Sequence, residues 1–298
     1  MNYSETKNKF KGTGVAIVTP FNKNNEIDYV SLQKLVEHVI DGGVNYIVLF
    51  GTTGEAPTII IQEKQEAVKK VAGFINKRVP LVLGFGGNFT ENLIKDIKSF
   101  DFSGVDAILS VCPYYNKPNQ DGIYSHFAAI ANATTIPIIL YNVPGRTIVN
   151  IEPNTTIKLA NTFKNIIGIK EATDNLDHVM GLINNKPEDF IVVAGDDALA
   201  LPFMSLGADG AISVIANAMP SYFSSIINEV AKGDYDKARD NHYKLLPLMH
   251  ALLKTGNPSG IKAVLNEMKL CENIFRLPVH PANKEQIELL VNEARKLI

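Results

Sequence analysis

The sequence lacks the residues and patterns that mark several large protein classes. It holds only two cysteines in 298 residues, Cys112 and Cys271. They lie far apart, so the sequence predicts no disulfide framework and a reducing compartment. Its 29 basic and 31 acidic residues are spread along the chain and give a net charge of -2. It therefore has no basic stripe of the kind that nucleic acid or acidic lipid requires, and neither partner is expected.

Histidine clusters and long apolar runs are also missing. The six histidines, at positions 38, 126, 178, 242, 250 and 280, lack the spacing of a zinc site, so no metal is predicted. The first residues, MNYSETKNKFKGTG, contain no apolar signal core. No later stretch approaches the roughly 18 uninterrupted apolar residues of a membrane span. We therefore expect a cytoplasmic protein that does not enter a membrane.

The sequence instead alternates short apolar runs with longer segments of helical spacing. The apolar runs are nearly continuous, which is typical of parallel strands buried on both faces. Each is followed by a helix-patterned segment such as SLQKLVEHVI (31–40). Eight strands are predicted, at VAIVTP (15–20), NYIVLF (45–50), PLVLGF (80–85), VDAILSV (105–111), IPIILYN (136–142), NIIGIK (165–170), FIVVAG (190–195) and GAISV (210–214).

Eight strand and helix units in one chain predict a (β/α)₈ TIM barrel over residues 1–231, with a doubly wound open sheet as the main alternative. After Ala231 no strand signal remains. Three helical segments follow, at 234–254, 258–268 and 283–298. We expect residues 232–298 to form a three-helix C-terminal extension of the same folding unit.

In a barrel of this kind, catalytic groups lie at the carboxyl ends of the strands. Four unusual segments fall there. They are GTTGE (51–55), CPYYNKP (112–118), YNVPGRT (141–147) and the lysine that ends NIIGIK, Lys170.

Lys170 is unusual because it ends an apolar strand. Side chains alternate along a strand, so it is predicted to share one face with Gly168 and Ile166, with Ile167 and Ile169 on the other. If the Gly168 face is the barrel interior, the glycine leaves space beneath the lysine, and loss of water disfavours the ammonium form. A neutral amine attacks carbonyl groups and forms Schiff bases. The alternative is a lysine that reaches solvent, or that pairs with an acidic neighbour such as Glu171.

The other segments offer groups for a small anionic substrate. The hydroxyls and backbone N–H groups of GTTGE can hold a carboxylate. Arg146, after the Pro144 and Gly145 turn, can bind a second carboxylate through two parallel hydrogen bonds. Tyr141, on the face of Ile139, is a candidate to move protons. Taken singly, each also fits a structural role as a connecting turn, a surface arginine or a packed tyrosine.

Two features are interpreted as structural. Asp196 and Asp197 of AGDDALALPF follow a strand and precede a helical segment, which favours N-caps over metal ligands. The glycines of LGFGGNFTEN (83–92) lack the spacing of a dinucleotide fingerprint. No cofactor is predicted.

Taken together, the motifs resemble a known family. GTTGE, PYYNKP, LYNVPGRT, GIKEAT and GDD, in this order and spacing, resemble the 4-hydroxy-tetrahydrodipicolinate synthases (dihydrodipicolinate synthases), which are class-I pyruvate-dependent lyases. The likeness runs from Gly12 to RLP (276–278). It implies a barrel enzyme that condenses pyruvate with L-aspartate 4-semialdehyde through a lysine Schiff base, on the diaminopimelate route to L-lysine.

The resemblance also implies a role for individual residues. Lys170 matches the Schiff-base lysine, and a proton relay is matched by Tyr141, Thr52 and Tyr115. Substrate contacts are matched by Thr53 for the pyruvate carboxylate, Ile212 through its main chain, Arg146 for the carboxylate of the semialdehyde, and Gly195 of the GDD motif.

Assembly and regulation follow from the same likeness. In the family the tyrosine at the Tyr115 position enters the neighbouring subunit's site, which implies a functional dimer at least, usually arranged as a dimer of dimers in a homotetramer. Lysine-inhibited members carry two histidines and a glutamate where this chain has Ile61, Lys64 and Asn92, whereas Asn88 and Tyr114 still match the effector pocket. We predict weak or absent inhibition by L-lysine, because the carboxylate that would pair with its ammonium is missing.

Two other functions remain as alternatives. One is another pyruvate lyase of the superfamily, acting on N-acetylneuraminate or a 2-keto-3-deoxy sugar acid; these tend to lack an arginine at the position of Arg146. The other is a non-catalytic barrel that binds a metabolite, which would be expected to have lost a member of the set formed by Lys170, Tyr141, Thr52 and Tyr115.

Overall fold

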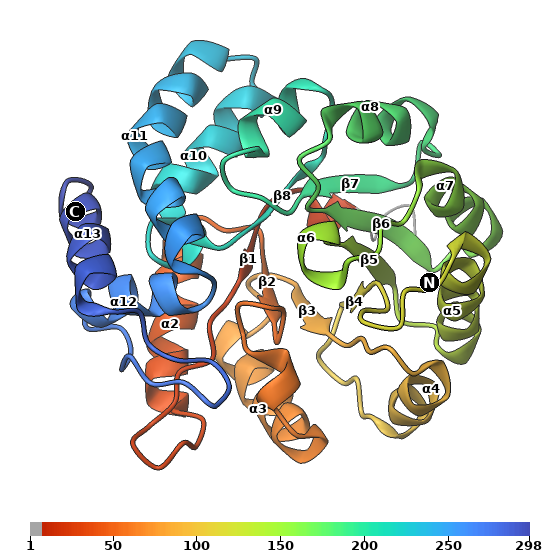
Figure 1. The fold of residues 1–298 in the computed structure, drawn as a ribbon, viewed down its shortest axis with the longest axis horizontal. Coiled ribbons are helices and arrows are strands. Elements are labelled where there is room, and N and C mark those ends of the chain that lie inside the picture. The colour runs from red at the N-terminus through yellow and green to blue at the C-terminus, as the bar shows by residue number, and fades with distance from the viewer. Residues whose placement is uncertain (1–7) are drawn as a thin grey trace.

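The computed structural model describes residues 8–298, in which eight parallel strands close into a barrel in chain order (Figure 1). The first strand pairs with the last, so the predicted (β/α)₈ barrel is confirmed and the open sheet is excluded. The strands are β1 (Gly12–Ala16), β2 (Tyr46–Leu49), β3 (Leu81–Gly84), β4 (Ala107–Val111), β5 (Ile138–Asn142), β6 (Ile166–Glu171), β7 (Ile191–Ala194) and β8 (Gly210–Ser213).

Helices surround the ring of strands. The main ones that follow the strands are α2 (Tyr29–Asp41), α3 (Ile61–Ile75), α4 (Thr90–Ser99), α5 (Gln120–Ala133), α7 (Pro153–Thr162), α8 (Leu176–Asn185), α9 (Ala200–Ser205) and α10 (Pro220–Ala231). Shorter helical turns are η1 (Asn8–Phe10), η2 (Ala56–Thr58), α6 (Pro144–Thr147) and η3 (Ile215–Asn217). Local sequence sets several starts; for example, the Asp28 carboxylate accepts hydrogen bonds from the N–H groups of Val30 and Ser31 at the start of α2.

Three more helices follow the barrel: α11 (Tyr235–Thr255), α12 (Ser259–Glu267) and α13 (Lys284–Arg295). Their positions agree with the three helical segments predicted after residue 231. The long α11 packs along α10, and α13 packs against both α11 and α12 (Figure 1). The segment between α11 and α12 thereby returns to the carboxyl end of the barrel.

The strands separate two apolar cores. One fills the barrel interior with residues such as Val48, Val82 and Val193, and the other lies between the strands and the helices. Since both faces of each strand are buried, the near-continuous apolar runs are explained.

The predicted position of the first strand is wrong. It was expected at 15–20, but β1 is Gly12–Ala16. Thr13 and Gly14 interrupt the apolar pattern in the sequence although both are buried, whereas the apolar residues from Ile17 onward lie in the connection after the strand. The shift places this connection, rather than a strand, beside the GTTGE turn, where the Thr19 hydroxyl donates to the Gly54 carbonyl over 2.6 Å.

Candidate active site

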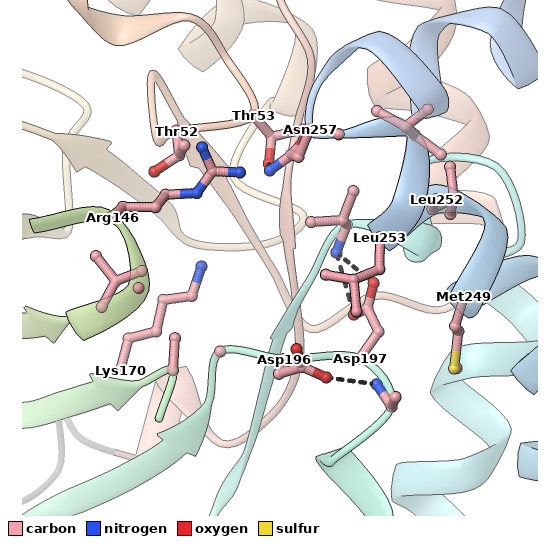
Figure 2. A pocket seen from close by; sticks show the side chains of 18 of the residues that line it. Thr52, Thr53, Arg146, Lys170, Asp196, Asp197, Met249, Leu252, Leu253 and Asn257 are labelled. Carbon is pink, nitrogen blue, oxygen red and sulfur yellow. Dashed lines mark hydrogen bonds between the residues drawn. The ribbon is translucent and has the colours of Figure 1, made fainter. Parts of the chain in front are cut away.

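A cavity of about 430 Å³ lies at the carboxyl ends of the strands. Six of the eight predicted site residues line it: Thr52, Thr53, Tyr141, Arg146, Lys170 and Gly195. They come from five different parts of the barrel. Figure 2 shows the side chains of Lys170 and Arg146 extending into the same space, with Thr53 beside Asn257 across from the lysine. Tyr115 and Ile212 do not line the cavity.

Lys170 projects from β6 into this cavity and is only 4% exposed. Its strand neighbour on β5 is Tyr141, and its Nζ lies 4.6 Å from the centroid of the Tyr141 ring. The carboxylate of the adjacent Glu171 accepts hydrogen bonds from Asn142 and Thr173 instead. Pairing of Lys170 with Glu171, one of the alternatives, is therefore excluded, and the amine is left facing the cavity.

The alternation predicted for β6 is broken by a bulge. Ile138 on β5 pairs with Ile166, but the next residue, Ile139, pairs with Gly168. The extra residue, Ile167, packs inside the barrel, while Ile166 packs outside it. The prediction that Ile166 shares the face of Lys170 and that Ile167 lies opposite is thus wrong, because a bulge inserts one residue into the period of two.

Two glycines allow the close packing around Lys170. A Cβ on Gly168 would lie 2.2 Å from Ile191 Cγ1, so the isoleucine, rather than empty space, occupies the gap beneath the lysine. A Cβ on Gly195 would lie 3.0 Å from Lys170 Cε and 2.7 Å from the Ala172 Cβ. Any larger residue at 195 would therefore push the lysine stem out of its position.

The predicted proton relay is incomplete within one chain. Thr52 Oγ1 and the Tyr141 hydroxyl are 3.5 Å apart, at the limit of a hydrogen bond. Tyr115, by contrast, is 90% exposed and has a left-handed backbone with φ of 75°. Its side chain does not reach the cavity of its own subunit.

Thr53 has a partner that was not predicted. Its hydroxyl accepts a 3.0 Å hydrogen bond from the Asn257 amide, in the segment between α11 and α12. Asn257 lines the cavity, and its Oδ1 is buried without a hydrogen-bond partner. The two residues are 204 positions apart, so no local pattern links them.

The two aspartates after β7 have different roles. Asp196 accepts from the N–H groups of Ala198 and Leu199 and so holds the turn before α9, but the N-cap residue of that helix is Leu199, so the predicted N-cap role of Asp196 is wrong. Asp197 does not cap that turn. It accepts from the N–H groups of Val214 and Ile215, at 3.1 and 2.8 Å, and so holds the connection after β8, just beyond the buried Ile212. Burial raises the pKa of Asp197 to about 6.

A second network lies behind Lys170. Glu171 is fully buried, and its carboxylate accepts hydrogen bonds from the Asn142 amide, the Thr173 N–H and His178 Nε2, the last at 3.2 Å. Burial is the largest single effect on the pKa of His178 and acts to lower it, but the hydrogen bond to Glu171 and the negative charges of Glu171 and Glu152 together raise the net pKa. Since Asn142 follows Tyr141 and Glu171 follows Lys170, the network ties the two strands together next to both side chains.

A second cavity, of about 270 Å³, adjoins the first and shares Thr52, Tyr141 and Arg146 with it. It is also lined by Lys64, which lies 5.5 Å from the ring centroid of Phe85 and whose pKa is lowered by burial. Among the described residues that line it, two are cationic and none is acidic.

A sequence model of the dihydrodipicolinate synthetase family matches residues 9–296. The chain belongs to this family.

Individual members of the family are similar over almost their whole length. The 4-hydroxy-tetrahydrodipicolinate synthase of Parabacteroides distasonis is 46% identical, over 96% of this chain and 97% of the relative. A dihydrodipicolinate synthase structure from Thermotoga maritima has a TM-score of 0.94 at 39% identity, covering 96% and 98% of the two chains. The chloride-inhibited enzyme from Acinetobacter baumannii, complexed with pyruvate, has a TM-score of 0.92 at 41% identity, covering 96% and 98%. The predicted family, fold and lyase class are confirmed.

Two structural features are missing from residues 8–298. No helix among them has the length and apolar character needed to cross a membrane. No three of their histidine, cysteine, aspartate and glutamate side chains gather in a way that would hold a metal ion.

Proposed function

We propose that this protein condenses pyruvate with L-aspartate 4-semialdehyde to give 4-hydroxy-tetrahydrodipicolinate, with Lys170 as the Schiff-base residue. The observation that carries the proposal is the buried Lys170 amine, which faces a cavity lined by hydroxyls and by Arg146. Relatives at 42–47% identity are named for this activity, and the Acinetobacter baumannii relative was crystallised with pyruvate.

The chemistry assigns each residue a task. The Lys170 amine adds to the ketone carbon of pyruvate and loses water, which gives an imine and makes the methyl protons acidic. Removal of one proton gives an enamine, whose methylene carbon attacks the aldehyde. The amine of the semialdehyde then displaces Lys170 as the ring closes. Thr53 and the main chain near Ile212 receive the pyruvate carboxylate, Gly195 adds a substrate contact, and Arg146 receives the carboxylate of the second substrate.

Each step moves a proton, which we assign to Tyr141, Thr52 and Tyr115. Because Tyr115 is exposed and does not line the cavity of its own subunit, we propose that it completes the site of a neighbouring subunit in a homotetramer arranged as a dimer of dimers. An exposed Phe89 lies near the same surface, since Asn88 and Asn116 hydrogen-bond across the two loops.

We also propose that residues 232–298 form one unit with the barrel of residues 1–231, because Asn257 contacts Thr53 in the cavity at the carboxyl ends of the strands. A cytoplasmic location fits an enzyme that acts on free metabolites of amino-acid biosynthesis.

Borohydride reduction in the presence of pyruvate, followed by peptide mass mapping, tests the mechanism. We expect one adduct, on Lys170, and none on the half-buried Lys64 or on the buried Lys262. A K170R variant, which keeps the charge but has no reactive amine, serves as the control. An adduct elsewhere, or none in the wild type, would refute the proposal. A comparison of turnover with the semialdehyde and with sugar acids then distinguishes the proposed activity from that of the other pyruvate lyases.

A further inference from the structure

A second buried lysine lies near the site but takes no part in the chemistry described above. Lys262, on α12, and Glu55, the last residue of GTTGE, have fully buried side chains, and Lys262 Nζ lies 2.5 Å from Glu55 Oε1. The ammonium also donates to the Ile274 carbonyl over 2.8 Å and lies over the rings of Phe21 and Phe275.

Such a pair needs an explanation beyond stability. Removing two charges from water costs about as much as their attraction returns, and apolar side chains of the same volume often stabilise a protein equally well. Here the pair joins residues 207 positions apart, one in the substrate-binding turn and the other in the C-terminal extension. A fixed geometry, rather than added stability, is what a fully hydrogen-bonded buried pair supplies best.

The turn that ends at Glu55 is held in an uncommon conformation. Glu55 has φ of 55°, in the left-handed region that non-glycine residues seldom occupy. Its N–H donates to the Thr52 carbonyl over 3.1 Å. The position of Glu55 therefore sets the position of Thr52 and Thr53, which precede it and line the cavity.

The C-terminal extension contacts the GTTGE turn at two residues, Thr53 and Glu55. Asn257, five residues before Lys262, donates to the Thr53 hydroxyl, and Lys262 holds Glu55 two residues later in the turn. Other Glu55 contacts come from the same region, since its second oxygen accepts from the Arg276 N–H over 3.3 Å. The turn is thus fastened to α12 and the segment after it as well as to β2.

We propose that Lys262 and Glu55 are positioning residues that fix the GTTGE turn, so that Thr53 and Thr52 face the pyruvate attached to Lys170. The inference rests on the proposed function, because it assigns the turn to the pyruvate carboxylate. Arg146 lies on α6 and not on this turn. Binding of pyruvate should therefore depend on the pair, and binding of the semialdehyde should depend on it much less.

Steady-state kinetics of four variants test this proposal: K262M, E55Q, the double variant E55Q/K262M and the conservative K262R. The matched control is K186M. Lys186 likewise donates to a backbone carbonyl, that of Phe190, and pairs with a carboxylate, Asp209, but at the amino end of the barrel. All variants are compared at a temperature where circular dichroism shows them folded.

We expect K262M and E55Q to raise the pyruvate KM by roughly tenfold to a hundredfold, the range produced when a positioning group moves by about an ångström. The semialdehyde KM should change by less, K186M should change neither, and K262R should restore part of the loss. The double variant should recover stability, because it leaves no unpaired buried charge, but it should not recover the pyruvate KM.

If folded K262M and E55Q keep the wild-type pyruvate KM, or if the double variant recovers it together with stability, the pair is only structural and the proposal fails. If K262M does not fold, E55Q and the double variant still give the same two readings. Borohydride trapping of the wild type with pyruvate distinguishes failure of the proposed function from failure of the positioning role. No adduct on Lys170 refutes the proposed function, whereas a normal adduct with unchanged KM values in the variants refutes the positioning role alone.

Discussion

Two lysines of this barrel are almost equally buried but have opposite surroundings. Lys170 is 4% exposed and Lys262 is fully buried. Each lysine also lies over an aromatic ring: the Lys170 Nζ is 4.6 Å from the ring centroid of Tyr141, and the Lys262 Nζ is 4.5 Å from that of Phe21. Lys262 is bonded to a carboxylate and a carbonyl. Lys170 has no ion pair with any carboxylate of residues 8–298 and points into a cavity.

These surroundings suit the two lysines to different roles. Burial lowers the pKa of Lys262, and the Glu55 carboxylate acts against that change. Its ammonium protons are taken up by fixed partners, so the group is suited to hold a turn in place. The nitrogen of Lys170 faces the cavity and forms no ion pair with residues 8–298, which leaves it free to form a bond to a carbonyl carbon.

Replacing Lys170 is expected to have the largest effect on activity. K170M is expected to abolish turnover and pyruvate trapping, since no other lysine of residues 8–298 lines the cavity. Its free energy of unfolding should be unchanged or higher, because an apolar side chain replaces a buried amine that forms no ion pair with residues 8–298. Turnover assays and urea unfolding measure the two effects. Substantial remaining turnover, or a large loss of stability, would contradict the assignment of Lys170.

Replacing Lys262 should give the reverse pattern. K262M leaves Glu55 buried without its cation, which is expected to lower the free energy of unfolding by about 3–5 kcal/mol. Trapping of pyruvate on Lys170 should persist at saturating pyruvate. Urea unfolding of K262M beside E55Q/K262M measures the effect, and the double variant should lose less. A K262M protein as stable as wild type would show that the pair is not coupled as its geometry indicates.

Lys170 and Lys262 also differ in what the sequence reveals. The strand-end position and the motifs were enough to predict Lys170, together with its cavity neighbours Thr52, Thr53, Tyr141 and Arg146. Lys262 carries no such signal, because its partner is 207 residues away. A lysine in an amphipathic helix is read from sequence as a surface residue.

Two other features that the sequence did not predict also depend on contacts between distant parts of the chain. Asn257 is joined to Thr53 across 204 residues. The bulge at Ile167 depends on how β5 and β6 pair, which the alternation rule ignores. The barrel itself was predictable because eight apolar runs with helices between them admit few closed arrangements.

Arg146 is a third cation near the site, and it is predicted to bind the carboxylate of the semialdehyde rather than to react. R146K keeps the charge but loses the planar two-donor geometry. We expect the semialdehyde KM to rise by about tenfold to a hundredfold, which corresponds to the 1.5–3 kcal/mol of a charge-assisted hydrogen bond. The rate of pyruvate trapping on Lys170 should stay at the wild-type value. A change in pyruvate trapping alone would place Arg146 at the first substrate instead.

The pair of His178 and Glu171 offers a titratable counterpart to Lys262 and Glu55. The folded-state pKa of His178 is raised, so its contribution to stability is complete below the unfolded-state pKa of about 6.5. It is lost as the pH rises through the higher folded-state value. Relative to H178Q, the wild type should therefore lose on the order of 1 kcal/mol between pH 6 and 9, as expected for one charge-assisted hydrogen bond.

Urea unfolding across this pH range measures the difference. Glu152 also acts electrostatically on His178, so an E152Q variant serves as the control and should keep most of the slope. If wild type and H178Q show parallel pH profiles, the histidine is not the charged partner of Glu171.

The smallest effect is expected for L-lysine, whose ammonium would meet Lys64 in the second cavity. Burial lowers the pKa of Lys64. Together with Arg146, this lysine makes the second cavity cationic. Ile61 and Asn92 do not line the cavity. A ligand ammonium would face like charge without a carboxylate partner, so sub-millimolar L-lysine should leave turnover unchanged. K64E supplies the missing carboxylate and should bind L-lysine more tightly than wild type in calorimetry, with K64Q as the uncharged control. Strong inhibition of the wild type would mean that a group outside this cavity, such as one from a neighbouring subunit, receives the ammonium.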